Sequence, residues 1–576
     1  MMEFPPDQAL LEEKNTLLQS CGLDEQMMFY KWESWCLQRD NKPVLNLDNF
    51  KAFAADMRTQ MERQVRATLR DKPEKKTTKT KLGMNFENML GLPAKSHDSK
   101  NSNSNHPVPP TSDAPSLTDE SGRVLEALNA HIPSASTNAN GKKPASTEIT
   151  SSIDPRAYHY RIMFQKLQDS SEVLDDRIDL FSAIVCDHYK IADEDLANPS
   201  ELTQEMVTVV GRVVVDSNTV GGRLNTNSIL IETSRRLGAG ARVSLKLDEV
   251  SSYSIFPGQI LALKGSNPSG KTFVAKEVLP LPPLPFSVSS KEEIENFNNK
   301  ANNQPISIYV ASGPWSLRDD LSFTPLKALV SYLLENPIDL VILTGPFIDI
   351  NHPILSTGNI PDTQVTSLED FFKERVSPIL SKISCKCILL PHINDAISNH
   401  PAWPQDTFDR HTLGLPSNFI CFPNPCIFSV NEVVFGISTN DILLHTSKEE
   451  LFRTPTHGNL FSRLVAHVIQ QRHFYPLFPG GSLDRGNPSN IDISHLKLGE
   501  LFKTVPDVLI LPSDMRYFAK TVENVISINP GKATKGVGLG SFAKLTILPY
   551  PLDSSTPSSD LLHNAQSRTK VEILKL

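Results

Sequence analysis

The clearest pattern in the chain is a series of short apolar runs, rich in β-branched residues, in its last half. Each run stops at Gly, Pro, Ser or Asn. Such runs are typical of strands buried on both faces of a layered sheet. They are Ile306–Trp315, Leu340–Ile350, Cys387–Ala396, Val433–Ile442 and Asp507–Ala519. Because α/β folds place chemistry just beyond the carboxyl ends of strands, these five ends are the first candidates for a functional site.

Amphipathic stretches between these runs predict the helices of the same domain, which is expected over residues 304–576. The expected surface helices are Leu321–Leu334, Leu368–Lys382 and Phe461–Gln470. Ahead of the domain, Lys291–Asn303 is predicted to be a polar connection and Pro280–Pro285 a stiff spacer.

Residues 200–285 carry short runs separated by glycine-rich turns. They predict a small OB-type β-barrel, with a bulge at Gly211 and the strands Val207–Val215, Ser228–Glu232, Arg242–Leu247, Gln259–Lys264 and Thr272–Val278. Barrels of this kind bind single-stranded nucleic acid by stacking bases on aromatic rings, or they serve in protein contacts. The scarcity of aromatic residues favours protein contacts, since there are only Tyr253, Phe256 and Phe273.

One motif in the barrel imitates a nucleotide site. Gly265–Thr272, GSNPSGKT, matches the phosphate-binding pattern G-x-x-x-x-G-K-[ST] at every position. That loop must lead into a helix whose first amides meet the phosphates. Here it leads into the alternating strand pattern Thr272–Val278 and then into prolines, which end helices. The segment is therefore predicted to be a hairpin turn and not an ATP site.

The first part of the chain predicts helices. Residues 1–71 are expected to form a small helical docking domain, because Asp7, Asp24 and Asp48 each precede an apolar pattern at helical spacing. Its Met and aromatic stripe has two interpretations, a core that short helices need to persist or a groove for partner peptides. Residues 156–199 predict a helical lead-in to the barrel, in the form of a helix pair.

Between these helical parts, residues 72–155 are rich in Ser, Asn, Lys, Pro and Thr. This composition buries too little apolar surface to order a chain, so a disordered linker is predicted. Its lysine run, Lys72–Lys81, suits either a nuclear import signal or a solvated flank of the preceding helix. Its apolar island, Leu82–Leu92, is suited to folding onto a partner.

Composition narrows the class of protein. A chain of 576 residues predicts about three domains, at ~100–200 residues each. With a net charge of −8 it lacks the surplus of Lys and Arg for strong DNA binding, so at most a weak DNA contact is expected. The cysteines form no Cys-x-x-Cys pair and are predicted to be free thiols, with no cofactor. No long apolar segment indicates secretion or a membrane span.

The five strand ends resemble, in their order, those of calcineurin-like metallophosphoesterases. Active members carry Asp-x-His, Gly-Asp, Gly-Asn-His-Asp/Glu and a final Gly-His-x-His, which hold two metal ions and the attacking water. The resemblance implies a phosphoesterase-type α/β domain without its metal ligands and without catalytic or cofactor-binding residues. The degenerate positions are Ala311, Gly313, Pro346, Ile393, Asn394 and Ser513. Asp349 and Asp395 lie nearby, where they suit either one stray cation or ordinary loop hydrogen bonds.

Longer stretches resemble the second (B) subunits of eukaryotic replicative DNA polymerases, and most closely the DNA polymerase alpha–primase branch of that family. They are Ser254–Lys264, Ile342–Ile350, Val434–His445, Arg472–Pro479, Val508–Lys520 and Ile528–Gly536. The resemblance implies a nuclear, non-catalytic scaffold subunit in a heterotetramer with the catalytic subunit and the primase subunits. In that family the barrel and the phosphoesterase-like domain hold the C-terminal region of the catalytic subunit, and the N-terminal domain docks replisome proteins. The expected role is the initiation of DNA replication and lagging-strand priming.

Two other functions stay open on the sequence. One is the B subunit of polymerase delta or epsilon, against which the long linker after a small helical domain counts. The other is an active metal-dependent phosphodiesterase, which two bound metal ions and phosphodiester cleavage would indicate.

Overall fold

The computed structural model describes residues 49–51, 53–54, 121–133, 147–216, 223–336, 338–358, 360, 365–454, 458–480, 490–501, 503–552 and 560–576. By its internal contacts the chain divides into two units, Met1–Met84 and Asn85–Leu576. In the first unit Phe50 and Phe53 are buried, with ring centroids 5.7 Å apart. The rest of the predicted helical domain, the lysine run and the apolar island lie outside the described residues and stay predictions.

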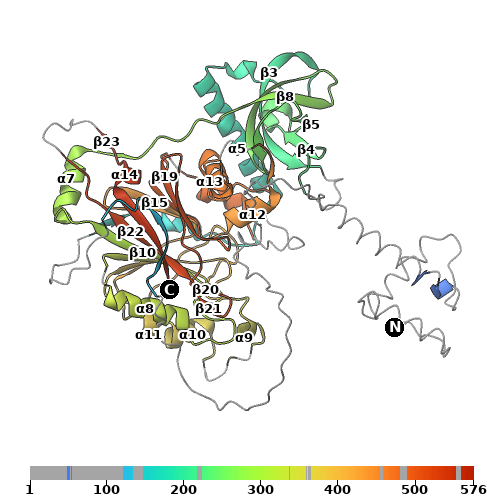
Figure 1. The fold of residues 1–576 in the computed structure, drawn as a ribbon. Coiled ribbons are helices and arrows are strands. Elements are labelled where there is room, and N and C mark those ends of the chain that lie inside the picture. Colours follow the sequence, from blue (N-terminus) through green and yellow to red (C-terminus); the bar gives the residue numbers. More distant parts are fainter. Residues whose placement is uncertain are drawn as a thin grey trace, which may run out of the picture. The chain divides into compact units, whose positions relative to one another are not determined.

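Two stacked β-sheets form the centre of the second unit (Figure 1). The seven-stranded sheet has the order β1 (Val124–Leu128), β24 (Thr569–Lys575), β22 (Ser541–Ile547), β10 (Ile306–Ser312), β11 (Leu340–Thr344), β12 (Lys386–Leu390) and β13 (Phe419–Cys421). The six-stranded sheet has the order β18 (Phe518–Val522), β19 (Val525–Asn529), β17 (Val508–Ile510), β15 (Val433–Ile437), β14 (Cys426–Val430) and β2 (Ile149–Thr150). Strands β10 to β13 run parallel, so their carboxyl ends meet at one edge.

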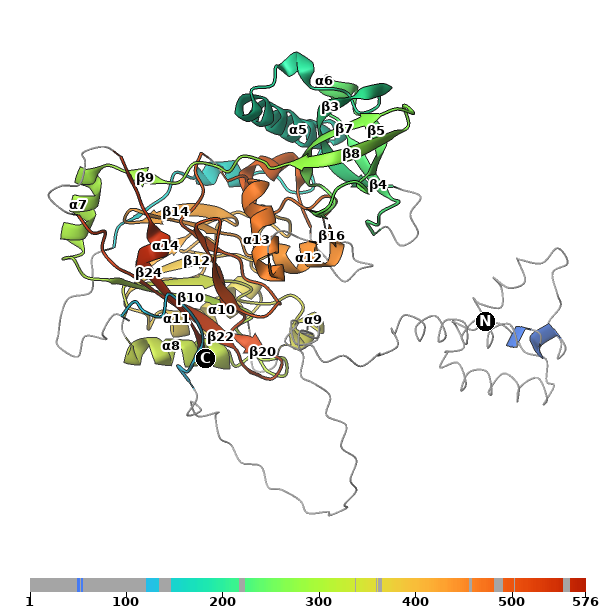
Figure 2. The ribbon, with the colours of Figure 1, turned by 45° about the horizontal axis from the view of Figure 1, so that its top comes forward.

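Helices cover the outer faces of both sheets. On the seven-stranded sheet lie α8 (Thr324–Glu335), α10 (Leu368–Arg375) and α11 (Ser377–Leu380). On the six-stranded sheet lie α12 (Ile442–Glu449) and α13 (Leu460–Gln470), on the side that faces the barrel in Figures 1 and 2. Because both faces of each sheet are covered, successive residues are all buried: Ile308 packs between the sheets and Tyr309 under the helices. The predicted layered α/β fold is confirmed.

The predicted barrel is confirmed as well. Its closed order is β3 (Thr203–Val215), β4 (Ile229–Glu232), β5 (Arg242–Lys246), β8 (Thr272–Leu279) and β7 (Ile260–Asn267). The bulge predicted at Gly211 is wrong, because Gly211 pairs in regular register with Leu261 and the register shift lies between Thr203 and Val207. A Cβ on Gly211 would lie 2.7 Å from the Glu232 carbonyl oxygen, so close strand approach explains the glycine.

The imitation of a phosphate loop is a hairpin turn, as predicted. It joins the antiparallel strands β7 and β8, and no helix follows it. Asn267 shapes the turn by accepting hydrogen bonds from the backbone N–H of Thr272 (3.3 Å) and the hydroxyl of Ser269 (3.3 Å). Gly270 takes a positive φ of 68°.

Three sequence predictions for segments outside the barrel need correction. The predicted linker is ordered in part, because Val124–Leu128 pairs with β24 and Ile149–Thr150 with β14; both are short apolar runs that extend sheet edges. The predicted helix pair is a single helix, α5 (Leu167–Tyr189). The predicted polar connection is α7 (Lys291–Lys300), whose start is stabilised by a capping box between Ser290 and Glu293.

Short elements complete the second unit. They are α6 (Arg235–Gly238), α9 (Pro353–Ser356), α14 (Ala565–Arg568), η1 (Pro155–Tyr158), η2 (Asp193–Asp195), η4 (Ile493–Gly499), β6 (Tyr253–Ile255), β9 (Val288–Ser289), β16 (Leu451–Arg453), β20 (Thr534–Lys535), β21 (Gly538–Leu539) and β23 (Leu561–Leu562). The cysteines of the described residues are free thiols. None of the helices described is long and apolar enough to cross a membrane.

Candidate functional site at the strand ends and the junction with the barrel

The structure brings the first predicted positions together at one edge of the seven-stranded sheet. The backbone N–H of Gly313, after β10, donates to the Thr344 carbonyl oxygen at the end of β11 (3.0 Å). A Cβ on Gly313 would lie 2.4 Å from the Pro346 carbonyl oxygen, so a larger residue does not fit there. Ala311 is buried in the core beneath the helices. The first two strand ends are thus packed backbone against backbone.

The third strand end closes over the second. The Ile350 N–H, beyond β11, donates to the Asn394 carbonyl oxygen (2.9 Å). Asn394 and the neighbouring Ile393 follow β12, as the sequence predicted. The Asn394 N–H itself is bonded to His392 Nδ1 (3.0 Å). Burial lowers the pKa of His392 to about 3, so its imidazole is neutral at pH 7.

Asp395 is the central carboxylate of this edge, and it is buried. It accepts hydrogen bonds from the backbone N–H groups of Phe347, Ile348 (3.2 Å) and His392 (3.0 Å). Burial raises its pKa to about 7, although these N–H groups oppose the shift. A Cβ on Gly345 would fall 1.9 Å from Asp395 Oδ2. Asp395 therefore joins the loops after β11 and β12, in agreement with the hydrogen-bonding interpretation.

Ser513 lies at the end of β17 in the other sheet. Its N–H donates to Asn529 Oδ1 (3.0 Å), and its hydroxyl accepts from the Met515 N–H (3.1 Å). The edges of the two sheets are joined by the Thr439 hydroxyl, which donates to the Pro391 carbonyl oxygen (2.9 Å). Both side chains are thus occupied in holding backbone.

The sequence reasoning missed a lysine beside the strand ends. Lys532 forms an ion pair with Asp514, and the Asp514 N–H donates to Asp441 Oδ2 (2.7 Å). Lys532 also opposes the rise that burial causes in the pKa of Asp349. Asp441 was recognisable as the residue that caps α12. Nothing in the spacing around Lys532 marks it, since its partners come from other loops.

These contacts define what the edge can do chemically. Within the described part of the chain, no group of three or more His, Cys, Asp or Glu is arranged to hold a metal ion. The polar side chains instead hydrogen-bond to backbone groups of neighbouring loops, which fixes the strand ends to one another.

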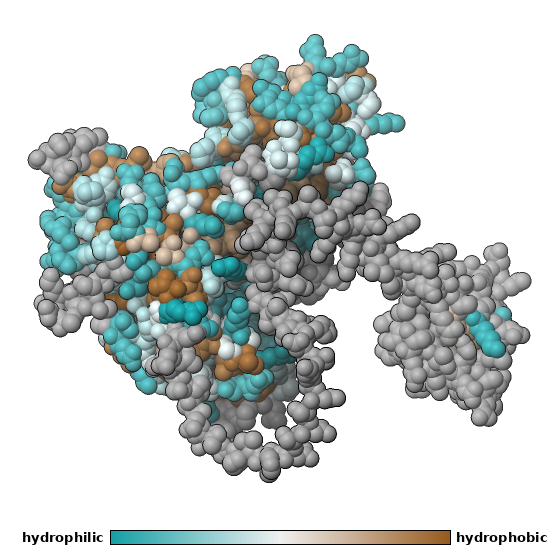
Figure 3. Space-filling model, in the orientation of Figure 1, coloured by the Kyte–Doolittle hydropathy of each residue, from teal (hydrophilic) through white to brown (hydrophobic). Residues whose placement is uncertain are grey.

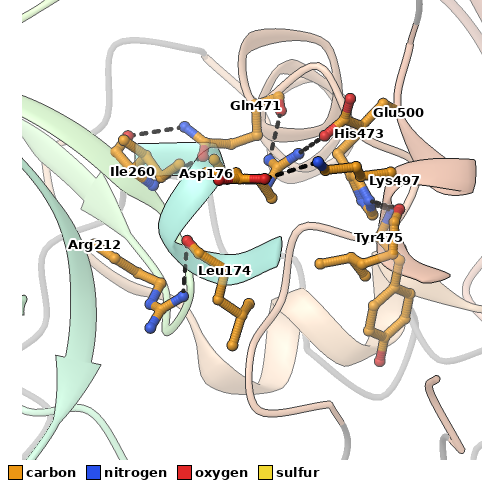
Figure 4. Close-up of polar contacts among 11 residues, drawn as sticks. Leu174, Asp176, Arg212, Ile260, Gln471, His473, Tyr475, Lys497 and Glu500 are labelled. Carbon is orange, nitrogen blue, oxygen red and sulfur yellow. Dashed lines mark hydrogen bonds and ion pairs between the residues drawn. The ribbon is translucent and has the colours of Figure 1, made fainter. Parts of the chain in front are cut away.

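A second polar region lies where the barrel meets the layered α/β domain (Figure 4). Gln471, just after α13, is almost fully buried. Its Oε1 accepts from the Ile260 N–H (2.8 Å), and its Nε2 donates to the Ile260 carbonyl oxygen (3.0 Å). One amide side chain thus pairs with barrel strand β7 as a neighbouring strand would.

Helix α5 connects the two domains at the same place. Arg177 of α5 donates to the Gln471 carbonyl oxygen (3.1 Å) and to Glu500 (3.3 Å). Arg212 of β3 donates to the Leu174 carbonyl oxygen of α5 (3.3 Å), as Figure 4 shows. The apolar face of α5 is shared too, because Phe181 packs on the barrel and Val173 on the core under α12 and α13. The helix is therefore part of both domains.

A buried ionic cluster closes the junction on its other side. Strand β6 of the barrel region pairs with β16 of the layered α/β domain. Just before β16, Glu450 accepts two hydrogen bonds from Arg463 (2.7 and 2.8 Å), one from His467 (2.9 Å) and one from the Ser254 hydroxyl. Burial opposes ionisation of Glu450, but the bonds from His467, Arg463 and Ser254 outweigh it and lower its pKa to about 2.

The same two domains match known families. The family of the DNA polymerase alpha/epsilon B subunit matches residues 308–520, and the family of the OB domain of the DNA polymerase alpha B subunit matches residues 171–281. A Schizosaccharomyces pombe protein, named as the B subunit of DNA polymerase alpha, is 64% identical over 576 residues, which is 100% of both chains.

The chain belongs to the family of DNA polymerase alpha B subunits. The Saccharomyces cerevisiae B subunit of DNA polymerase alpha is 33% identical over 504 residues, covering 79% of this chain and 71% of its own. The resemblance to the alpha branch is therefore confirmed. The OB-domain match begins inside α5, at residue 171, and therefore includes most of this helix.

Solved structures add little to this assignment. An archaeal phosphodiesterase aligns with 47% of this chain and 100% of its own, at 11% identity and a TM-score of 0.22. A score that low supports no argument. The layered fold of this member of the DNA polymerase alpha B-subunit family rests on its own sheet topology.

Proposed function

We propose that this chain is the non-catalytic tether of a DNA polymerase alpha–primase assembly. The observation that supports it is the buried junction, in which Gln471, Arg177 and the Glu450 cluster hold the barrel against the phosphoesterase-like domain. A rigid two-domain body gives a partner two surfaces at a constant distance, which lowers the entropy lost on binding. The body grips the C-terminal region of the catalytic subunit, and through it the primase subunits, in a heterotetramer.

In this proposal the phosphoesterase-like domain has no hydrolytic activity. The support is chemical, since Pro346, Ile393 and Gly313 stand where metal ligands are needed and offer no side-chain donor atom. Asp395 is occupied by three backbone N–H groups. The domain acts through its surface, and the barrel contacts protein more than nucleic acid.

The N-terminal part extends the reach of the tether. Its helical domain docks replisome proteins, and the linker keeps that domain at high local concentration near the polymerase. The lysine run Lys72–Lys81 supplies the signal for nuclear import. The assembly then acts in the initiation of DNA replication and at each lagging-strand start.

Affinity purification from the chain's own cells tests the proposal. At moderate salt, a large polymerase subunit and two primase subunits should remain bound in near-equal amounts by mass spectrometry. Recovery of the chain alone would contradict the tether. In the same preparation, cleavage of a phosphodiester substrate with added Mn²⁺, lost in chelator, would contradict the absence of hydrolytic activity.

A further inference from the structure

Three large apolar side chains are left open to solvent just before and at the start of α5. Leu167 is 93% exposed, Met163 91% and Phe164 65%. On the face seen in Figure 3, hydrophobic residues are interspersed with hydrophilic ones. Soluble proteins tolerate single exposed apolar residues, but three within five positions make a local surface that another molecule would cover. This surface, Met163, Phe164 and Leu167, is called the α5 ledge below.

The segment that carries the ledge is anchored at two points, one before the ledge and one within it. Before it, the Tyr160 ring stacks on His495 with centroids 3.8 Å apart, and the Tyr160 hydroxyl donates to the Pro404 carbonyl oxygen. Within it, Gln165 Oε1 accepts from the Ile493 N–H (3.3 Å). The apolar side chains therefore stay exposed although their backbone is fixed, and a partner would lose little entropy in ordering them.

The ledge continues the face by which α5 holds the junction. One apolar stripe of the helix consists of Leu167, Leu174, Ile178, Phe181 and Val185, which recur at helical spacing. The last three are buried against the molecule's own core, and Leu174 is half-buried. Leu167 lies on the same stripe one to two turns beyond that core. The stripe extends beyond the body it packs on, and its first turn is left exposed at Leu167.

Charge around the ledge narrows the kind of partner. Along the chain, the basic residues Arg161 and Lys166 come before Leu167, and the acidic residues Asp169 and Glu172 come after it. The formal charges of these four residues cancel. The Arg161 guanidinium lies over the Phe164 ring, 5.3 Å from its centroid. Without a surplus of positive charge, these residues give phosphates little attraction, which favours an apolar protein face over a nucleic-acid backbone or an anionic membrane.

We propose that the α5 ledge is a docking surface for the apolar face of a helix from another subunit of the same assembly. The inference rests on the proposed tethering function and names a surface through which the tether is made. Met163 and Leu167 would insert between the partner's apolar side chains, as interface anchors do. Because the contact is apolar and its surroundings are balanced, its strength should change little with salt.

Methionine oxidation in the assembled complex tests the location directly. With hydrogen peroxide, Met163 in the free chain should form the sulfoxide fast, while the buried Met515 should react slowly. In the complex purified from its own cells, oxidation of Met163 should slow by about tenfold or more relative to the exposed Met206 of β3. Equal rates for Met163 in the free and assembled chain would overturn the proposal.

Variants test whether the ledge contributes binding. Leu167→Asp suits the first turn of a helix, where a negative charge is favourable, so the fold should be kept. Its affinity for the purified partner subunits should fall about tenfold or more. The matched control is Leu334→Asp on α8, where Leu334 is 58% exposed. If wild type binds the partner subunits and both variants bind them equally well, the α5 ledge is not a docking surface, although the proposed tether still holds. If wild type binds none of the partner subunits, the docking proposal and the tether proposal are both contradicted.

Discussion

The strand ends and the junction are both polar, but the partners of their side chains lie in different places, in the same domain at the strand ends and in another domain at the junction. At the strand ends, Asp395 and Ser513 bond to backbone N–H groups in loops of the same domain. At the junction, Gln471 and Glu450 bond to groups that belong to the barrel region. The first arrangement fixes one domain's loops, and the second fixes one domain to another.

This difference separates two uses of polar side chains, one within a domain and one between domains. A buried ionic cluster such as that of Glu450 carries a large desolvation cost, and its gain in net stability over apolar packing is small. Such a cluster is useful where geometry must be specified, which is the requirement of a rigid two-domain body. The strand ends, in contrast, use their polar side chains to hold loops within a single domain.

The largest effect is expected from removing the charge at the junction. Glu450→Gln leaves Arg463 buried without its carboxylate and should lower the free energy of unfolding by about 3–5 kcal/mol in urea at pH 7. Since the pKa of Glu450 is lowered to about 2, its contribution is present above its unfolded value near 4.5 and is lost as pH falls toward 2. The control Glu277→Gln, in an exposed pair with Lys264, should change stability by less than about 1 kcal/mol. Equal losses would remove the distinction between buried and surface pairs.

At the strand ends the expected effect depends on pH. The pKa of Asp395 is raised to about 7, so between about pH 4 and pH 7 the folded chain holds a proton that the unfolded chain has lost. As the pH rises from about 4 to about 7, the free energy of unfolding of wild type should therefore fall by up to about 4 kcal/mol, and that of Asp395→Asn should not. Urea unfolding of both proteins at several pH values measures the difference. A difference that does not vary with pH would mean that the three N–H bonds keep the carboxylate ionised throughout.

A smaller effect is expected from the amide that pairs with the barrel strand. Gln471→Met leaves the buried N–H and carbonyl groups of Ile260 unpaired and should cost about 1–3 kcal/mol. The neighbouring Gln470→Met removes only a half-buried bond to Glu523 and is the matched control. Hydrogen exchange at Ile260 should speed up in the first variant alone. Similar exchange in both would show that Gln471 does not hold the barrel.

The smallest expected effect is that of metal removal. Because Pro346, Ile393 and Gly313 offer no ligand atoms, EDTA should leave the melting temperature of the purified chain unchanged. Differential scanning calorimetry with and without chelator measures it. A drop in melting temperature that Mn²⁺ reverses would show a bound ion, and the strand ends would then be a candidate catalytic site.

The sequence predicted the barrel and the layered sheets because their signals are local. The barrel strands are short runs between turns, some of them alternating like Arg242–Lys246, and runs such as Leu340–Thr344 are apolar throughout because both faces are covered. The short edge strands Val124–Leu128 and Ile149–Thr150 escaped, since a few apolar residues in a polar stretch become ordered only through β24 and β14. Their order depends on tertiary contacts that no local pattern carries.

The candidate site was predicted in one half only. The strand ends follow from family spacing, and the structure places them at adjoining edges. The junction could not be found, because Gln471 lies 211 positions from its partner Ile260 and Arg177 lies 323 from Glu500. Side chains that act between domains have no motif, and only their burial in the folded chain identifies them.

In the proposed tether, the two domains act as one rigid body that grips the catalytic subunit. The most direct test compares the affinity of the purified catalytic subunit for wild type, for Gln471→Met at the junction and for Asn394→Ala at the strand ends. Gln471→Met should weaken binding by about tenfold, while Asn394→Ala should bind as wild type does. Unchanged binding by Gln471→Met, or a loss confined to Asn394→Ala, would contradict it.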